Sequence, residues 1–317
     1  MSELWMMIGK RLLYGLLTLF IVSVIIFGAS EMLPGDQAQA LLGQSATPET
    51  LAALREQLGL NDPAPVRYWN WLAGAMSGDF GISTSNQRPI ADLISGRLYN
   101  TMFLALYAAT LAVPLSLVLG LLAALWRNSI FDRVANASAL TSISFPEFFV
   151  AYILIVWLAQ GGHFTSLARI RENTTFVQRL DMTFLPALTL TLVVTAHMMR
   201  MTRAAIINLM ASPYIEMARL KGLSPLRVVL RHALPNALAP IITVVALNLA
   251  YLITGVVAVE VVFTYPGLGQ LMVNSVADRD MPVVQAISLI FASAYVLLNL
   301  LADVLSTLSN PRLRHRR

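Results

Sequence analysis

The sequence contains no cysteine, only two lysines and few charged residues of any kind. Without cysteine the chain has no disulfide and no metal site built from thiolate ligands. Charged residues make up 12% of its 317 residues and hydrophobic residues 57%, whereas soluble chains carry about 25% charged residues. So few polar groups cannot cover a water-exposed surface. The composition therefore excludes soluble, disordered and collagen-like proteins and indicates an integral membrane protein.

The scarcity of lysine also excludes one activity. A phosphate-binding loop needs Gly-Lys followed by Ser or Thr, but Lys10 precedes Arg11 and Lys221 precedes Gly222. The chain therefore does not hydrolyse ATP through such a loop. The histidines lack metal-ligand spacing, and no Ser/His/Asp arrangement or paired carboxylate site stands out. We expect no catalytic residues, no cofactor and no metal in this chain.

Six apolar stretches reach or approach the length of about 20 residues that a helix needs to cross a bilayer. They are residues 12–30, 101–126, 134–160, 183–199, 233–259 and 281–302. The first is longer than the apolar part of a cleaved signal peptide, so we expect it to remain in the protein. The sequence thus predicts an all-α integral membrane protein with six transmembrane helices.

The distribution of Lys and Arg predicts the orientation of these spans. With six spans, fourteen basic residues fall on the side that holds both ends of the chain and eight on the other. Positively charged residues stay inside, so both termini are predicted to be cytoplasmic. The net charge is +5, and the basic residues lie scattered between the apolar runs. This distribution favours a role in membrane orientation over nucleic-acid binding.

The spans define the expected domain organisation. We predict a cytoplasmic N-terminal tail of residues 1–11, one transmembrane domain over residues 12–309 and a basic cytoplasmic tail of residues 310–317. The transmembrane domain carries an external insertion at residues 31–100 and a cytoplasmic loop at residues 211–235, which we call the coupling loop.

The external insertion is predicted to be folded. Thr47 and Pro48 have the pattern of a helix start, a hydroxyl cap followed by proline, and Gly59 is placed to end that helix. Further along, Tyr68 and Trp69 are residue types that favour the headgroup layer. The insertion is expected either to lie on the outer membrane surface or to form a docking surface for an external partner.

The coupling loop has the pattern of two short helices joined by a turn. A hydroxyl cap followed by proline starts each helix, at residues 212–213 and again at residues 224–225. Gly222 can adopt the left-handed conformation that ends the first helix, and the second runs towards Pro235.

The first of these helices carries an apolar stripe of Tyr214, Met217 and Ala218 that is too small to form a core alone. We therefore expect the loop to form a compact, positively charged knob, that is, a small protruding surface that binds in a groove of another protein.

The spacing in this loop resembles a known motif. Glu216-Met217-Ala218, three residues, Gly222, nine residues and His232-Ala233-Leu234-Pro235 resemble the Glu-Ala-Ala loop of ABC-type import permeases, with departures at Met217 and His232. Leu33-Pro34-Gly35-Asp36, Gly78-Asp79-Phe80-Gly81 and Pro266-Gly267-Leu268-Gly269 are similar to segments of the dipeptide/oligopeptide/nickel permease family.

The resemblance implies a function and a set of site residues. It implies a type I ABC importer permease in the bacterial inner membrane that moves peptides or a related small solute by alternating access. The residues that it assigns to coupling with the ATPase are Tyr214, Glu216, Ala218, Gly222, Leu223, Ser224, Leu234 and Pro235. The solutes that it leaves open are dipeptides, oligopeptides, nickel complexes, glutathione and opines.

The same resemblance implies the partners. They are a second homologous permease subunit, two cytoplasmic ABC ATPase subunits that bind ATP and Mg, and an external solute-binding protein. All of them act at the lipid bilayer.

Glu147 is a charged residue within the predicted third span. Charges in lipid are costly and mark functional sites by default. Glu147 is expected either to line a polar pathway or to make a polar contact between helices around a break at Pro146. An alternative function is an ion-gradient-driven secondary carrier, which needs midplane charges at broken helices, and Glu147 is its one good candidate. A membrane scaffold without transport is a third possibility.

Overall fold

The computed structural model of the chain describes residues 2–32, 37–43, 46–159, 162, 164–165, 167–168, 170–171 and 173–308. Helices dominate these residues, and the only β pairing among them is an isolated antiparallel bridge between Ile82 and Pro89. The predicted all-α class is therefore confirmed. The predicted tail of residues 310–317 lies outside the described residues.

The chain forms two compact units. Unit 1 comprises Met1–Thr101 and Pro266–Val296, and unit 2 comprises Met102–Tyr265 and Leu297–Arg317. Two long helices, α5 (Ile90–Leu125) and α14 (Met281–Leu308), each contribute one part to either unit.

The helices that lie wholly in unit 1 are α1 (Ser2–Glu31), α2 (Gln37–Leu42), α3 (Pro48–Gln57), α4 (Ala64–Ser77) and α13 (Leu268–Ala277). Since α1 begins at Ser2, the predicted N-terminal tail and the first span form one continuous helix.

The start and end of α3 agree with the sequence prediction. The hydroxyl of Thr47 accepts a hydrogen bond from the backbone N–H of Thr50 at 3.2 Å, and the hydroxyl of Thr50 accepts one from the N–H of Thr47 at 3.0 Å. Pro48 follows the cap. Gly59 has a φ of +65° just after the helix, in the left-handed region that glycine tolerates.

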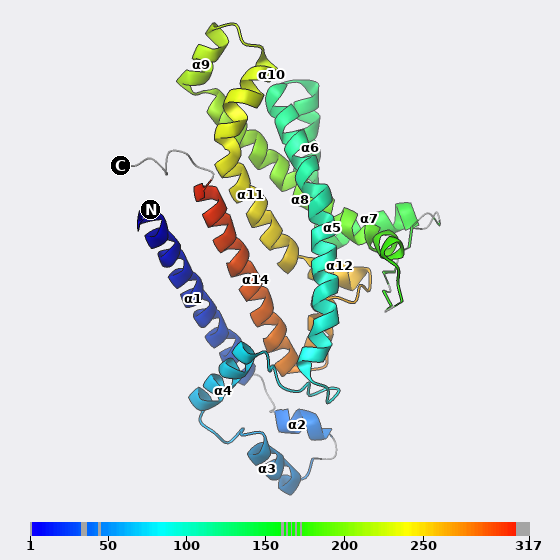
Figure 1. Cartoon of the computed structure of the whole chain (residues 1–317). Helices are drawn as coiled ribbons and strands as arrows, with labels where there is room; N and C mark the ends of the chain where they lie inside the picture. The colour runs from blue at the N-terminus through cyan, green and yellow to red at the C-terminus, as the bar shows by residue number, and fades with distance from the viewer. Residues whose placement is uncertain are drawn as a thin grey trace. The chain divides into compact units, whose positions relative to one another are not determined.

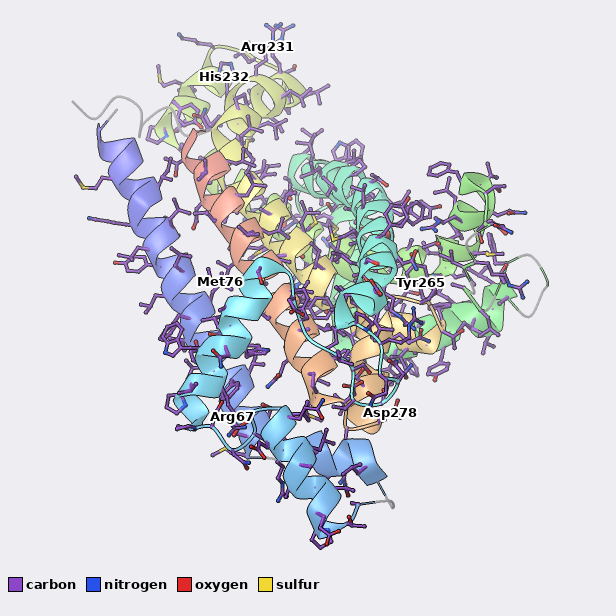
Figure 2. The ribbon with its side chains drawn as sticks, turned by 60° about the horizontal axis from the view of Figure 1, so that its bottom comes forward. Arg67, Met76, Arg231, His232, Tyr265 and Asp278 are labelled. Atoms are coloured by element: carbon purple, nitrogen blue, oxygen red, sulfur yellow. The ribbon has the colours of Figure 1, made fainter. Side chains whose placement is uncertain are left out.

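The aromatic residues of α4 pack against α1. The hydroxyl of Tyr68 lies 2.7 Å from that of Ser23, and its ring contacts Phe20 and Phe27 edge-on. Arg67 of α4, which Figure 2 labels, forms a salt bridge with Glu31, the last residue of α1. Tyr68 is therefore buried at 8% exposure. Its hydroxyl lies within hydrogen-bonding distance of Ser23, so this side chain packs inside unit 1. The position of the insertion at the membrane surface stays a prediction.

The buried carboxylate of Asp280 holds the loop of residues 83–85 in unit 1. Asp280, which is 1% exposed, accepts hydrogen bonds from the backbone N–H and hydroxyl of Thr84, both at 3.0 Å, and from the hydroxyls of Ser83 and Ser85. Burial acts to raise the pKa of Asp280, but these hydrogen bonds outweigh it and hold the pKa below its usual value.

Unit 2 contains the remaining helices. They are α6 (Ile130–Ser144), α7 (Glu147–Leu154), a π-helix (Ile155–Ala159), α8 (Phe176–Met210), α9 (Pro213–Leu220), α10 (Pro225–Val228), a second π-helix (Val229–Ala233), α11 (Leu234–Thr254) and α12 (Val256–Val262). The helix α8 lies at the centre of this unit and packs against α6, α7 and α11 (Figure 1).

Gly120 allows α5 to approach α8 closely. A Cβ at this position would lie 2.8 Å from the carbonyl oxygen of Met199 and 2.9 Å from Cβ of Thr202. The missing side chain therefore sets the separation of the two helices at this crossing.

Five helical segments in the described part of the chain are long and apolar enough to cross a membrane. They are Ile8–Glu31, Ile90–Leu125, Phe176–Met210, Pro225–Thr254 and Met281–Thr307. The fourth predicted span, residues 183–199, is thus only the middle of a longer helix.

The third predicted span, residues 134–160, is broken. Its two halves, Ile130–Ser144 and Glu147–Ala159, meet at 106°, and a sixth span exists only if this bent pair counts as one. Phe145 is extended, with a ψ of 136°, as the residue before a proline prefers. Pro146 therefore ends one helix and precedes the next, so the break expected there is confirmed.

Candidate functional site

The two helices of the coupling loop, α9 and α10, lie together at one end of unit 2 (Figure 1). Proline occupies the first turn of both, as predicted. Ser212 and Ser224 occupy the predicted N-cap positions, but the expected capping by their hydroxyls is wrong, because neither makes a side-chain capping bond. In α9 the N–H of Ile215 instead donates to the carbonyl of Ser212 at 3.0 Å.

Gly222 ends α9 in the predicted left-handed conformation, with a φ of +77°. Its N–H donates to the carbonyl of Arg219 at 2.9 Å, and the N–H of Leu223 donates to that of Ala218 at 3.3 Å. These two bonds form a Schellman motif, which satisfies carbonyls that a helix end would leave free. No atom lies within 4 Å of a Cβ built on Gly222, so the backbone conformation alone calls for glycine here.

The second helix of the loop does not end at Pro235. It passes through the π-helix Val229–Ala233 into α11, and the N–H of Leu234 donates to the carbonyl of Val229, five residues back. Proline has no N–H and its ring clashes with the carbonyl four residues earlier. The wider π turn accommodates Pro235 within a continuous helix.

The carbonyl of His232, within this π-helix, receives two side chains. The amide of Asn236 donates to it at 2.8 Å, and the hydroxyl of Tyr214 donates at 3.5 Å. Figure 2 shows His232 and Arg231 at the end of unit 2 that the coupling loop forms. Tyr214 thereby connects α9 to the π-helix.

The coupling loop shares a hydrophobic core with the ends of two long helices. Buried Ile215 and Ala218 of α9 pack with Ile206 of α8 and with Ala237 and Ile241 of α11. Ile215 and Ala218 are three residues apart and so lie on one helix face. The loop is therefore part of the core of unit 2 and is not a separate knob.

The predicted apolar stripe is partly wrong. Ala218 is buried at 7% exposure, but Met217 is 55% exposed and Tyr214 is 36% exposed. Ile215, which the pattern did not single out, is fully buried.

The predicted site residues fall into two groups. Ala218, Leu223 and Leu234 belong to the core of the loop or pack against it. Tyr214, Glu216, Gly222, Ser224 and Pro235 are exposed. With Leu220 at 75% exposure and Leu226 at 53%, the outer surface mixes apolar and charged groups, a composition suited to a groove of a partner protein.

A largely buried ion pair, which sequence reasoning missed, joins α8 to α6. The guanidinium of Arg203 donates to both carboxylate oxygens of Asp132 in α6, at 2.6 and 2.7 Å. The carboxylate also accepts from the backbone N–H of Asn128 at 2.9 Å and from the side-chain amide of Asn136 at 2.7 Å. The sequence offered little signal for this pair, because Asp132 is followed directly by Arg133 and precedes the predicted span of residues 134–160.

Glu147 lies at the start of α7, after the break. Its carboxylate accepts a hydrogen bond from the hydroxyl of Tyr251 in α11. Gly255 leaves room for that tyrosine, because a Cβ there would lie 3.1 Å from Cζ of Tyr251. Within the described ranges no Lys or Arg forms a salt bridge with Glu147. The position of Glu147 on a solute pathway stays a prediction.

Comparison with known proteins follows the two halves of the chain. Residues 116–315 match the family model of the binding-protein-dependent transport system inner membrane component, and residues 4–105 match the model of its N-terminal part. The glutathione transport system permease protein GsiC of Escherichia coli K12 is 39% identical over 308 residues, which cover 97% of this chain and 98% of the relative. GsiC of Shigella dysenteriae serotype 1 matches with the same identity and coverage.

Proposed function

The chain belongs to the family of binding-protein-dependent transport system inner membrane components, and from this premise we propose how it moves its solute. It is the permease subunit of an ABC importer for peptide-like solutes, a multi-pass protein of the inner membrane that is not itself catalytic. As such a subunit it works with ATPase and solute-binding partners.

The proposed complex contains this permease, a second homologous permease, two cytoplasmic ATPase subunits that bind ATP and Mg, and one external binding protein. The proposed topology has six transmembrane helices and both termini in the cytoplasm, with the bent pair around Pro146 as the third span. The distribution of basic residues supports this orientation. The single transmembrane domain over residues 12–309, with its external insertion and coupling loop, is part of the same proposal.

In the proposed mechanism the coupling loop transmits the movement of the ATPase. Exposed groups such as Glu216 and Leu220 contact a cleft of that subunit. The observation that supports this role is the shared core of α9, α8 and α11. Because interiors are close-packed, a displacement of α9 moves the ends of both long helices. Reversing a conformational equilibrium from 1:99 to 99:1 takes roughly 5.5 kcal/mol of differential binding.

The proposed solute is a small peptide, and glutathione is the first to test because the relatives are named for its transport. Glu147 is proposed to lie on the pathway, where its carboxylate matches the ammonium group of a peptide. Two features support this assignment. The side chain follows a helix break, and its described partner is the neutral hydroxyl of Tyr251.

The test measures ATP-dependent uptake by the reconstituted importer. Gly222→Pro and Glu216→Lys should abolish uptake while the chain still reaches the membrane, and Glu216→Lys should also release the ATPase during purification. Arg133→Lys, an exposed position outside the coupling loop, is the matched control and should transport normally. Normal uptake by both loop variants would refute the coupling role. Uptake that persists without ATP and stops on addition of an ionophore would instead establish the secondary carrier.

A further inference from the structure

Unit 2 has a pocket beneath the coupling loop. Its volume is about 420 Å³, within the range of roughly 300–1,000 Å³ typical of small-molecule sites. It is lined by the end of α5, the end of α8 and the coupling loop. The lining residues are Ala124, Leu125, Arg127, Ile207, Met210, Ala211, Arg219, Leu223 and Pro225.

The charges that line this pocket are all positive. Arg127 and Arg219 contribute them, and no carboxylate lines the cavity. In the part of the chain that the structure describes, neither arginine forms a salt bridge: the nearby carboxylate of Asp132 pairs with Arg203, and exposed Glu216, one turn before Arg219, pairs with neither. Arginine side chains bind phosphate oxygens in a bidentate manner, so the charge that lines this cavity suits an anionic group of that kind.

The pocket lies where the predicted span of residues 101–126 ends. Leu125, near the end of this apolar stretch, lines its wall, which places this side of the pocket near the level of lipid headgroups. Trp126, beside Arg127, is 51% exposed, and tryptophan favours this interfacial layer. Apolar residues at the same wall, such as Leu125 and Met210, suit the glycerol and upper acyl region of a lipid.

We propose that this pocket binds the phosphate headgroup of an anionic phospholipid from the cytoplasmic leaflet, between Arg127 and Arg219. Basic pockets between transmembrane helices on the cytoplasmic side are sites of this kind. The choice of leaflet rests on the proposed orientation of the chain. A lipid bound here touches both the end of α8 and the turn after α9, which is the junction that the proposed mechanism displaces.

The test measures lipid binding and does not depend on transport. The importer complex is purified, freed of loosely bound lipid, placed in phosphatidylcholine nanodiscs with added phosphatidylglycerol, and examined by native mass spectrometry. The wild type should retain phosphatidylglycerol. Arg127→Gln should weaken retention by about tenfold or more, the loss expected for one charged hydrogen-bonding partner. Arg127→Lys, which keeps the charge but not the fork, should fall between them, and Arg133→Gln, outside the pocket, should match the wild type.

Three results would overturn the proposal. One is equal retention of phosphatidylglycerol by the wild type and Arg127→Gln. Another is release of the bound lipid by excess inorganic phosphate, which would show a site for free phosphate. The third is an Arg219→Gln variant that loses the ATPase subunit but keeps its lipid, which would assign the pocket to the protein partner. A failure of the transport mechanism would leave the lipid measurement unchanged, so the two proposals are tested separately.

Discussion

Replacing Arg203 with methionine should destabilise unit 2 by about 3 kcal/mol, because it leaves the carboxylate of Asp132 buried without its cation. The side chain of Asp132 is 4% exposed, whereas that of Arg203 is 23% exposed. The two side chains share a bidentate contact with N–O distances of 2.6 and 2.7 Å. Methionine keeps much of the arginine's apolar stem, so the variant removes mainly the charge.

Two limits set this magnitude. Removing one partner of a buried ion pair costs about 3–5 kcal/mol, and the lower end applies because Asn128 and Asn136 still donate to the carboxylate. The alternative is that the acid becomes neutral, and protonating an aspartate of ordinary pKa at pH 7 costs about 4 kcal/mol. The variant adopts whichever of these two states costs less, so the loss in the free energy of unfolding cannot greatly exceed about 4 kcal/mol.

The assay is thermal unfolding of the detergent-solubilised protein, followed by tryptophan fluorescence. A loss of about 3 kcal/mol should lower the midpoint by about 6–12 °C for a unit of this size. Asp132→Asn should cost less, because the remaining guanidinium can turn towards water. The double variant should recover most of the loss, since replacing both members of a buried pair is often neutral.

Arg200→Met is the matched control, because Arg200 is exposed on the same helix and surface changes stay within about 0.5 kcal/mol. An Arg203→Met protein that unfolds within about 2 °C of the wild type would refute the reasoning. So would an equal loss in Arg200→Met, which would show a general effect of charge.

Three further predictions concern single positions. Hydrogen bonds lower the pKa of Asp280 in the folded state, so they stabilise unit 1 fully above the pKa of an unfolded aspartate, about 3.9. This stabilisation should be lost as the pH drops through the lower pKa of the folded state. In thermal unfolding, Asp280→Asn should make the midpoint depend less on pH. Gly222→Ala should cost about 1 kcal/mol through its positive φ alone, and Gly222→Asn should cost less in the same measurement. Gly255→Ala should displace the ring of Tyr251 and release Glu147, so its uptake kinetics should match those of Tyr251→Phe.

Each of these predictions has a clear contrary outcome. Identical acid unfolding of the wild type and Asp280→Asn would exclude the carboxylate as the cause. Equal stability of the alanine and asparagine variants at residue 222 would remove the conformational argument. A normal rate for Tyr251→Phe beside a slow Gly255→Ala would show that the glycine acts by packing and not through Glu147.

Local signals predicted the elements of the coupling loop with mixed success. The prolines at residues 213 and 225 and the left-handed Gly222 were correctly placed, because turn and helix-start preferences act over a few residues. Ser212 and Ser224 were correctly placed at the N-cap positions, but their hydroxyls make no capping bond, and in α9 the N–H of Ile215 donates to the carbonyl of Ser212 instead. The buried face of α9 was wrong because Tyr214, Met217 and Ile215 are all apolar, and only the neighbouring helices decide which of them is covered.

The membrane spans show the same division. The apolar runs locate the spans along the chain but do not give all their lengths, since residues 183–199 are only part of Phe176–Met210. Residues 134–160 look continuous in composition, yet Pro146 divides them at an angle of 106°. Nothing in the hydropathy of that segment specifies the direction of the second half. The second helix of the coupling loop was predicted only as far as Pro235, yet a π turn carries the helix through this proline.

The amino-acid sequence is enough to establish that this protein lies in a membrane, is helical and lacks a Gly-Lys-Ser/Thr phosphate-binding loop, and it contains a segment that resembles the Glu-Ala-Ala loop of import permeases. Composition and local spacing are sufficient for these conclusions, because they depend on solvent transfer and on interactions between near neighbours. The tertiary structure alone decided that Asp132 meets Arg203 across 71 residues, that Glu147 meets Tyr251, and that two arginines line one pocket. Such pairs depend on how each helix is rotated and packed, and the spacing of residues along the chain does not specify that rotation.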